Sequence, residues 1–197
     1  MYENEKVDMR IKYTREWTFE ALHKLLAIKP FIDIKISEII DKAGISRATF
    51  YRNFSSKEDI VIIKVRNMFV DFHKAMIQYY TLNQPEDETV LISEFFKRID
   101  EEEKLIDAVI KTNLEYLMIE GITQIMSYYK EKFYELVRTN KKTEDYVMDI
   151  VASSCWTLLS RWIKTGKQEA ASELVEIYFA TFKSVYIALF GDKSDLV

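Results

Sequence analysis

The residues best suited to chemistry gather in one stretch, residues 44–60, which reads GISRATFYRNFSSKEDI. Four cations and no acid lie between Lys42 and Lys57, in a chain whose formal net charge is -4. Two adjacent aromatic residues, Phe50 and Tyr51, sit among these cations. A basic segment on an acidic protein favours contact with a polyanion, and aromatic side chains can anchor such a segment to its neighbours.

Reactive side chains are sparse elsewhere. The chain has two histidines, His23 and His73, and one cysteine, Cys155, with no Cys-x-x-Cys, glycine-rich phosphate loop or Gly-x-Ser-x-Gly. The sequence pairs no nucleophile with a base and groups no metal ligands. The acidic runs EDE and DEEE are typical of solvated helix starts. We therefore expect no enzyme activity, no catalytic residue, no cofactor and no metal.

The composition predicts a helical protein. The 197 residues are 48% hydrophobic, which is enough for a sizeable core, and they include only four glycines and two prolines. Few turn-forming residues indicate long helices with few breaks. A single cysteine fits a reducing compartment, and the sequence has no apolar signal core and no long uncharged apolar run. We expect a soluble cytoplasmic protein that does not contact membranes.

Hydrophobic spacing predicts the helices that position the basic stretch. A first helix over about 7–28 ends before Pro30, and a second, ISEIIDKA, is closed by Gly44. Ser46 suits the N-cap of a third helix over about 47–53. Two short helices joined by a tight turn form a helix-turn-helix, which lays its second helix in the major groove of DNA.

The rest of the chain continues the helical pattern. Ser55 with Glu58 forms a Ser-x-x-Glu capping box, for which Ser56 is the alternative cap. The expected fold is all-α, with about nine helices: an N-terminal three-helix head with the helix-turn-helix, and a C-terminal helical body. The further helices are expected over about 57–82, 89–99, 101–111, 113–137, 144–164 and 170–190.

The basic stretch resembles the G-[VI]-S-x-x-T-[LF]-Y-x-x-F-x-S-K-E-x-[LI] signature of TetR/AcrR-type transcriptional regulators, and the resemblance spans about residues 7–63. It implies a DNA-binding domain over 1–55 and a regulatory domain over 56–197, for effector binding and dimerisation. The second helix departs from the family pattern at Ile40, where alanine is usual. The matching residues are Gly44, Ile45, Ser46, Thr49, Phe50, Tyr51, Phe54, Ser56, Lys57, Glu58 and Ile60.

The resemblance also implies the DNA contacts. Arg47 would read guanine O6 and N7, Ala48 a thymine methyl, and Tyr51 a phosphate or a base. Thr49, Asn53 and Lys57 are expected to contact phosphates. Arg52 could contact either a phosphate or a base. At the start of the second helix the family often has a threonine that touches phosphate, and Lys35 or Ser37 could make that contact here. For each predicted DNA contact, the alternative is that the residue is only a solvated surface residue. The predicted contacts are Lys35, Ser37, Arg47, Ala48, Thr49, Tyr51, Arg52, Asn53 and Lys57.

In this family the last two helices of each subunit form a four-helix dimer interface, and the body hosts a small-molecule pocket. The same apolar residues would also suit the core of one subunit. The predicted interface comprises Trp156, Leu159, Leu174, Ile177, Tyr178, Thr181, Phe182 and Val185. The predicted effector pocket comprises Phe69, Phe72, His73, Phe95, Tyr116, Met126, Tyr129 and Trp156.

These features predict a repressor that binds a palindromic operator as a homodimer and is released by an unknown small-molecule effector. The alternative is a DNA-binding regulator or activator that is controlled by a protein partner and has no small-molecule pocket. The segment SRWIKTG, residues 160–166, resembles a low-GC Gram-positive subgroup of these regulators that includes a regulator of dihydroxyacetone kinase. That resemblance favours the protein partner.

Overall fold

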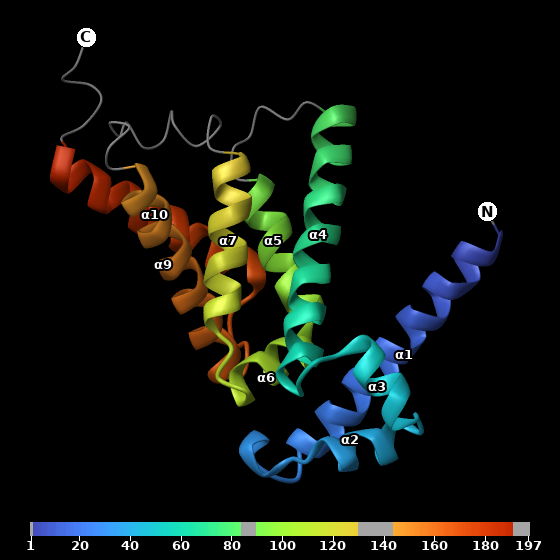
Figure 1. The fold of residues 1–197 in the computed structure, drawn as a ribbon. Helices are drawn as coiled ribbons and strands as arrows, with labels where there is room; N and C mark the ends of the chain where they lie inside the picture. The colour runs from blue at the N-terminus through green and yellow to red at the C-terminus, as the bar shows by residue number, and fades with distance from the viewer. Residues whose placement is uncertain (1, 84–89, 130–143, 191–197) are drawn as a thin grey trace. The chain divides into compact units, whose positions relative to one another are not determined.

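The computed structural model describes residues 2–83, 90–129 and 144–190, and within these ranges every regular element is helical (Figure 1). The all-α prediction is confirmed. The elements of the described ranges are α1 (Tyr2–Leu26), the 3₁₀ turn η1 (Phe31–Asp33), α2 (Ile36–Ala43), α3 (Arg47–Asn53), α4 (Glu58–Asn83), α5 (Val90–Glu101), α6 (Glu103–Lys111), α7 (Tyr116–Tyr128), α9 (Glu144–Lys164) and α10 (Ala171–Phe190).

The chain forms two compact units. The N-terminal unit contains residues 1–68 and 102–117, and the C-terminal unit contains residues 69–101 and 118–197. The change from one unit to the other falls inside α4, and α6 returns to the N-terminal unit. The assignment of functions to residues 1–55 and 56–197 stays a prediction.

The turn between α2 and α3 follows from two residues. Gly44 has φ 66°, a left-handed conformation that costs glycine little because it has no Cβ. The N–H of the next residue, Ile45, donates to Ile40 O at 3.2 Å, which closes α2 in the manner of a Schellman motif. Ser46 then opens α3, because its Oγ accepts from the N–H of Thr49 at 3.1 Å, as the sequence predicts.

The N-terminal unit packs around α3 and the first half of α4. Phe50 and Phe54 are buried, with ring centroids 5.3 Å apart, so the inner face of α3 is fixed. The expected cap at Ser55 is wrong in detail, and the alternative at Ser56 is observed. The Ser56 Oγ accepts from the N–H of Asp59, while the Asp59 carboxylate accepts from the N–H groups of Ser55 and Ser56.

Helix α6 is tied to α1 by side-chain bonds. Lys104 Nζ donates to both carboxylate oxygens of Glu20 at 2.8 Å, and this bond lowers the pKa of Glu20. His23 Nε2 lies 3.1 Å from Asp107 Oδ2. These pairs fix α6 in the N-terminal unit, although it follows α5 of the other unit in sequence.

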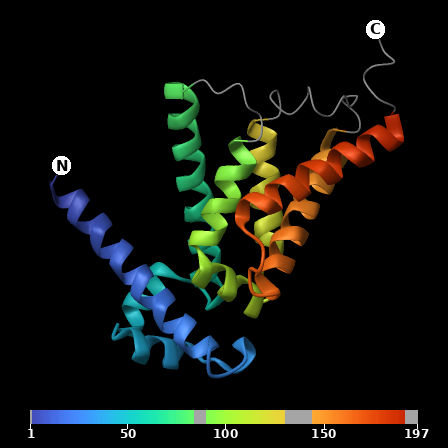
Figure 2. The ribbon, with the colours of Figure 1, turned by 180° about the vertical axis from the view of Figure 1, so that it is seen from behind.

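The C-terminal unit has an aromatic core. The rings of Phe69 and Phe72 on α4 lie 5.8 and 5.4 Å from the ring of Phe95 on α5. Helix α10 packs against α5 and α9, which Figure 2 shows from behind. Gly121 on α7 leaves room for Phe69, because a Cβ there would overlap the Phe69 ring. None of the helices over 2–83, 90–129 and 144–190 is long and apolar enough to cross a bilayer.

The SRWIKTG segment closes α9. Trp162 is buried, and its indole N–H donates to Glu169 O at 2.9 Å. Gly166 and Lys167 adopt left-handed φ values of 86° and 53°, which end the helix. The Lys167 ammonium lies 2.8 Å from Asp100 Oδ1 at the end of α5. These contacts give the segment a structural role within the C-terminal unit.

Candidate nucleic-acid interface

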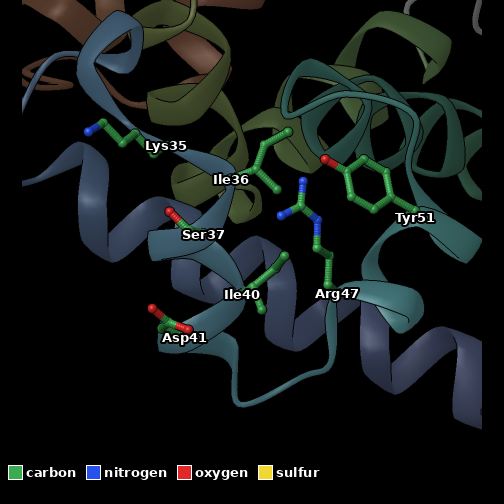
Figure 3. A pocket seen from close by; sticks show the side chains of 7 residues that line it. All are labelled: Lys35, Ile36, Ser37, Ile40, Asp41, Arg47 and Tyr51. Atoms are coloured by element: carbon green, nitrogen blue, oxygen red, sulfur yellow. The ribbon is translucent and has the colours of Figure 1, made fainter.

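A hollow of about 340 Å³ opens on the surface between α2 and α3. Its walls combine four predicted DNA contacts with two isoleucines and an aspartate (Figure 3). A polar groove with an apolar floor can receive hydrogen-bonding base edges as well as thymine methyl groups. The lining residues are Lys35, Ile36, Ser37, Ile40, Asp41, Arg47 and Tyr51.

Arg47 and Tyr51 form the centre of this surface. They lie one helical turn apart on α3, and the Arg47 Cζ is 5.6 Å from the centroid of the Tyr51 ring. Figure 3 shows the guanidinium beside the ring and next to Ile36. The ring therefore helps to hold the guanidinium in an extended position, where its donors can meet a nucleic acid.

The other predicted DNA contacts on α3 differ in whether their side chains already form hydrogen bonds within the protein. Ala48 and Arg52 are exposed. Thr49 Oγ1 lies 2.9 Å from Ser46 Oγ, and Asn53 Nδ2 donates to Thr49 O at 2.9 Å. The side chains of Thr49 and Asn53 thus form hydrogen bonds at the two ends of α3, and their contact with phosphate stays a prediction.

The Lys57 ammonium faces its own chain. It donates to Phe31 O at 2.7 Å, Ile32 O at 3.2 Å and Ile34 O at 2.9 Å, and it lies 4.4 Å from the centroid of the Phe31 ring. An ammonium has three N–H donors, so all of them are used. The geometry therefore speaks against the predicted phosphate contact and gives Lys57 a structural role, holding η1 and the entry to α2.

The start of α2 carries the two remaining predicted contacts, Lys35 and Ser37, which are exposed. The Lys35 N–H donates to Glu38 Oε2 at 2.9 Å, so the Glu38 side chain caps this end of α2. Lys29 Nζ donates to both oxygens of the same carboxylate at 2.6 and 2.7 Å. The Lys29 hydrogen bonds, followed by the Lys35 N–H, lower the pKa of Glu38. The negative charge of Glu38, beside the hollow, is therefore balanced by the Lys29 ammonium.

Three lining residues were missed by the sequence reasoning: Ile36, Ile40 and Asp41. Helical spacing could have found them, because residues four apart share a helix face. Ser37 and Asp41 have this spacing, as do Ile36 and Ile40, which indicates that α2 presents a face of its own. Asp41 is exposed, and a carboxylate on such a face can accept from a cytosine amino group and repels phosphate.

The predicted effector residues fall into separate groups. Phe69, Phe72 and Phe95 form the core cluster described above, and Met126 and Trp156 are also buried. His73 and Tyr129 meet at the α4–α7 contact, with ring centroids 5.9 Å apart. Tyr116 is half exposed and belongs to the N-terminal unit, whereas the other predicted pocket residues belong to the C-terminal unit.

The predicted dimer residues divide between the core and the surface of one chain, and their role in an interface stays a prediction. Trp156, Leu159, Leu174 and Tyr178 are buried within one chain, because α5, α9 and α10 pack their apolar sides together. Ile177 and Thr181 are exposed, whereas the side chains of Phe182 and Val185 lie outside the described residues. The apolar exposure that the sequence reasoning missed is on α9, at Tyr146 and Ile150.

Among the described residues no group of three or more His, Cys, Asp or Glu side chains could hold a metal ion. Cys155 is fully buried, and this burial raises the pKa of its thiol far above the ordinary value. A thiol that stays protonated is a poor nucleophile and a poor metal ligand.

Comparison with known proteins adds independent observations. Residues 19–62 match the family model of bacterial regulatory proteins of the tetR family. No curated protein sequence matches the chain significantly. Among solved structures, Lin0861 from Listeria innocua is similar with a TM-score of 0.71 at 15% identity, covering 90% of this chain and 93% of that one.

Two further structures share the fold. A TetR transcriptional regulator from Streptococcus agalactiae has a TM-score of 0.62 at 17% identity, over 91% of this chain and 98% of that one. The repressor FadR from Thermus thermophilus, in complex with lauroyl-CoA, has a TM-score of 0.55 at 16% identity, over 85% and 92%. The family model thus covers the helix-turn-helix, and the solved structures share the fold along most of the chain.

Proposed function

We propose that this protein is a repressor that binds a palindromic operator as a homodimer through α2 and α3, and that an effector bound in the C-terminal unit releases it. The N-terminal residues to about 55 read DNA, and the remainder of the chain regulates that reading. No catalytic role is included, because the fold and the family point to a regulator.

The observation that carries the proposal is the hollow between α2 and α3. Arg47 and Tyr51 project from α3 into a surface whose inner side is fixed by buried Phe50. A guanidinium held in this way suits bidentate bonds to guanine O6 and N7. Lys35, at the start of α2, adds a positive charge for the phosphate backbone.

The homodimer is supported by apolar exposure on the last helices. Tyr146 and Ile150 lie one turn apart on α9 and are 71% and 63% exposed, and Ile177 on α10 is 46% exposed. Large exposed apolar side chains on neighbouring helices often mark an interface. A seven-residue recognition helix makes few contacts, and a two-fold dimer doubles them on a palindrome.

Control by a small molecule is supported by the aromatic C-terminal unit and by the similarity to a repressor bound to lauroyl-CoA. The effector must bind one arrangement of the dimer better than the other. A coupling of about 1 to 3 kcal/mol would change operator affinity about 5- to 150-fold.

The first experiment is selection from a pool of random duplex DNA by the full chain, at two salt concentrations. Tyr51→Ala tests the interface, and Tyr13→Ala is the matched control, because the two tyrosines are 47% and 50% exposed in the same unit. We expect wild type and Tyr13→Ala to enrich one palindrome, with affinity falling as salt rises, and Tyr51→Ala to lose it. Equal enrichment by Tyr51→Ala would refute the proposed interface.

The dimer is tested by light scattering of Ile150→Glu, beside Gln124→Glu as a control that adds the same charge at an exposed site on α7. We expect only Ile150→Glu to form monomers. Repression is tested by transcription from the selected operator: less transcript with the protein than without it supports the proposal, and more transcript identifies an activator.

A further inference from the structure

Four aromatic side chains meet where α4 contacts α7. His73 and Tyr80 come from α4, Tyr129 directly follows α7, and Tyr128 ends that helix. The ring of His73 lies edge-on to those of Tyr128 and Tyr129, at 4.3 and 5.9 Å between centroids. The Tyr129 ring also stacks on Tyr80 at 5.4 Å. The cluster therefore fixes both side chains, His73 and Tyr129, in place.

Among the residues that the structure describes, two polar atoms in this cluster are buried without a hydrogen-bond partner: His73 Nδ1 and the Tyr129 hydroxyl. Tyr129 as a whole is only 7% exposed. Buried polar atoms in folded proteins are nearly always hydrogen-bonded, because leaving them unpaired costs stability. A phenylalanine at residue 129 would keep the ring contacts without that cost, so the hydroxyl calls for another explanation.

Both atoms can donate to the same oxygen-bearing group. Burial, followed by the neighbouring Tyr128 and Tyr80, raises the pKa of Tyr129 to about 12, so its hydroxyl keeps its proton. The imidazole carries a proton on Nδ1 in one of its two neutral tautomers. The two rings are neighbours, with centroids 5.9 Å apart, so both donors belong to one cluster.

We propose that His73 Nδ1 and the Tyr129 hydroxyl bind the carboxylate of an organic acid with an apolar tail. This inference rests on the proposed function, in which that acid is the effector. The tail meets apolar surface along α4, where Ile77, one turn after His73, is 41% exposed. Hydrogen-bond donors in an apolar setting suit a carboxylate, because hydrogen bonds to a charged group are stronger than neutral ones.

The test measures decanoate binding to the full chain without DNA, by calorimetry and by the shift in unfolding temperature. Tyr129→Phe and His73→Phe each remove one donor and keep a ring. Tyr128→Phe is the matched control, because it makes the same change at the adjacent residue, which is 62% exposed. Decyltrimethylammonium, with the same tail and the opposite charge, tests the class of ligand.

We expect decanoate to bind wild type and Tyr128→Phe alike, and to bind Tyr129→Phe and His73→Phe at least fivefold more weakly. Decyltrimethylammonium should bind all four proteins weakly. Without ligand, Tyr129→Phe should unfold at the same temperature as wild type or higher, since it loses an unpaired buried hydroxyl. A lower unfolding temperature of free Tyr129→Phe would overturn the inference, because the hydroxyl would then be bonded within the fold or to ordered water.

Other outcomes count equally against it: no binding of decanoate to wild type, equal affinity in Tyr129→Phe, or a preference for the cation. Because binding is measured without DNA, it is separable from the proposed function. Operator selection without decanoate binding removes only this inference. Decanoate binding without operator selection removes the proposed regulator.

Discussion

Replacing Lys57 by methionine separates two roles that the same side chain could have. As a phosphate contact, Lys57 would add to DNA affinity and to its salt dependence, and its removal would leave the fold intact. As a structural residue, its ammonium holds η1 and the entry to α2 through three backbone carbonyls. Methionine keeps the length of the side chain and removes the charge and the donors.

The magnitude follows from the three bonds. The bonds to Phe31 O and Ile34 O are part-buried, whereas Ile32 O is exposed and water can replace its donor. Two part-buried hydrogen bonds at about 1 kcal/mol each give about 2 kcal/mol. The Phe31 ring beside the ammonium adds about 0.5 kcal/mol. Lys57→Met should therefore destabilise the N-terminal unit by about 2 to 3 kcal/mol.

The assay combines urea unfolding, hydrogen exchange at the amides of α2, and the salt dependence of operator binding. Lys35→Met is the matched control, because Lys35 is exposed and lines the hollow. We expect Lys57→Met to lose stability and amide protection while its salt slope stays that of wild type. Lys35→Met should keep wild-type stability and reduce the slope by about 1, the effect of removing a single phosphate-binding cation. An unchanged stability of Lys57→Met with a reduced slope would refute the structural role and restore the phosphate contact.

Three further changes test local features by urea or thermal unfolding. Gly121→Ala places a Cβ against the Phe69 ring and should lower the free energy of unfolding by about 1 to 3 kcal/mol. Adding Phe69→Leu to the same chain should restore part of this loss. If the effects of the two substitutions simply add in the double variant, this contact is contradicted. Ser46→Ala removes the cap of α3 and should cost about 0.5 to 2 kcal/mol, with Ser127→Ala at an exposed site on α7 as the control. The pKa of Glu38 is lowered, so its contribution is present above the ordinary value of 4.5 and is lost as pH falls through the lowered value. Glu38→Gln should thus be less stable than wild type at neutral pH, with the difference closing in acid, and a pH-independent difference would contradict this.

Local chemistry explains why the helix-turn-helix was predictable. Gly44 permits a left-handed turn, Ser46 caps the next helix, and Phe50 lies four residues before Phe54 on the same face; each effect acts within a few residues. Such short-range rules give the helices and the sides they bury. They do not determine which of two adjacent serines takes the cap before α4, because the choice depends on Asp59 reaching back to two N–H groups.

The sites beyond the turn depend on contacts that no local rule contains. Lys57 reaches residues 23 to 26 positions earlier in the chain, so the family pattern alone suggests a phosphate where the fold supplies carbonyls. The apolar stripe of α10 predicted an interface, yet Leu174 and Tyr178 are used inside the subunit. An apolar stripe shows that a surface must be covered, and only the packing of α5 and α9 shows what covers it.

In the C-terminal unit, buried apolar residues and buried polar residues differ in what they indicate about a ligand. Phe69, Phe72 and Phe95 are explained completely by packing, so their burial says nothing about a ligand. A phenylalanine would pack equally well at residue 129, and the buried hydroxyl there is what packing leaves unexplained. The unpaired donors of His73 and Tyr129 therefore mark where regulation of this protein should be sought, and the core aromatics form the scaffold that holds them.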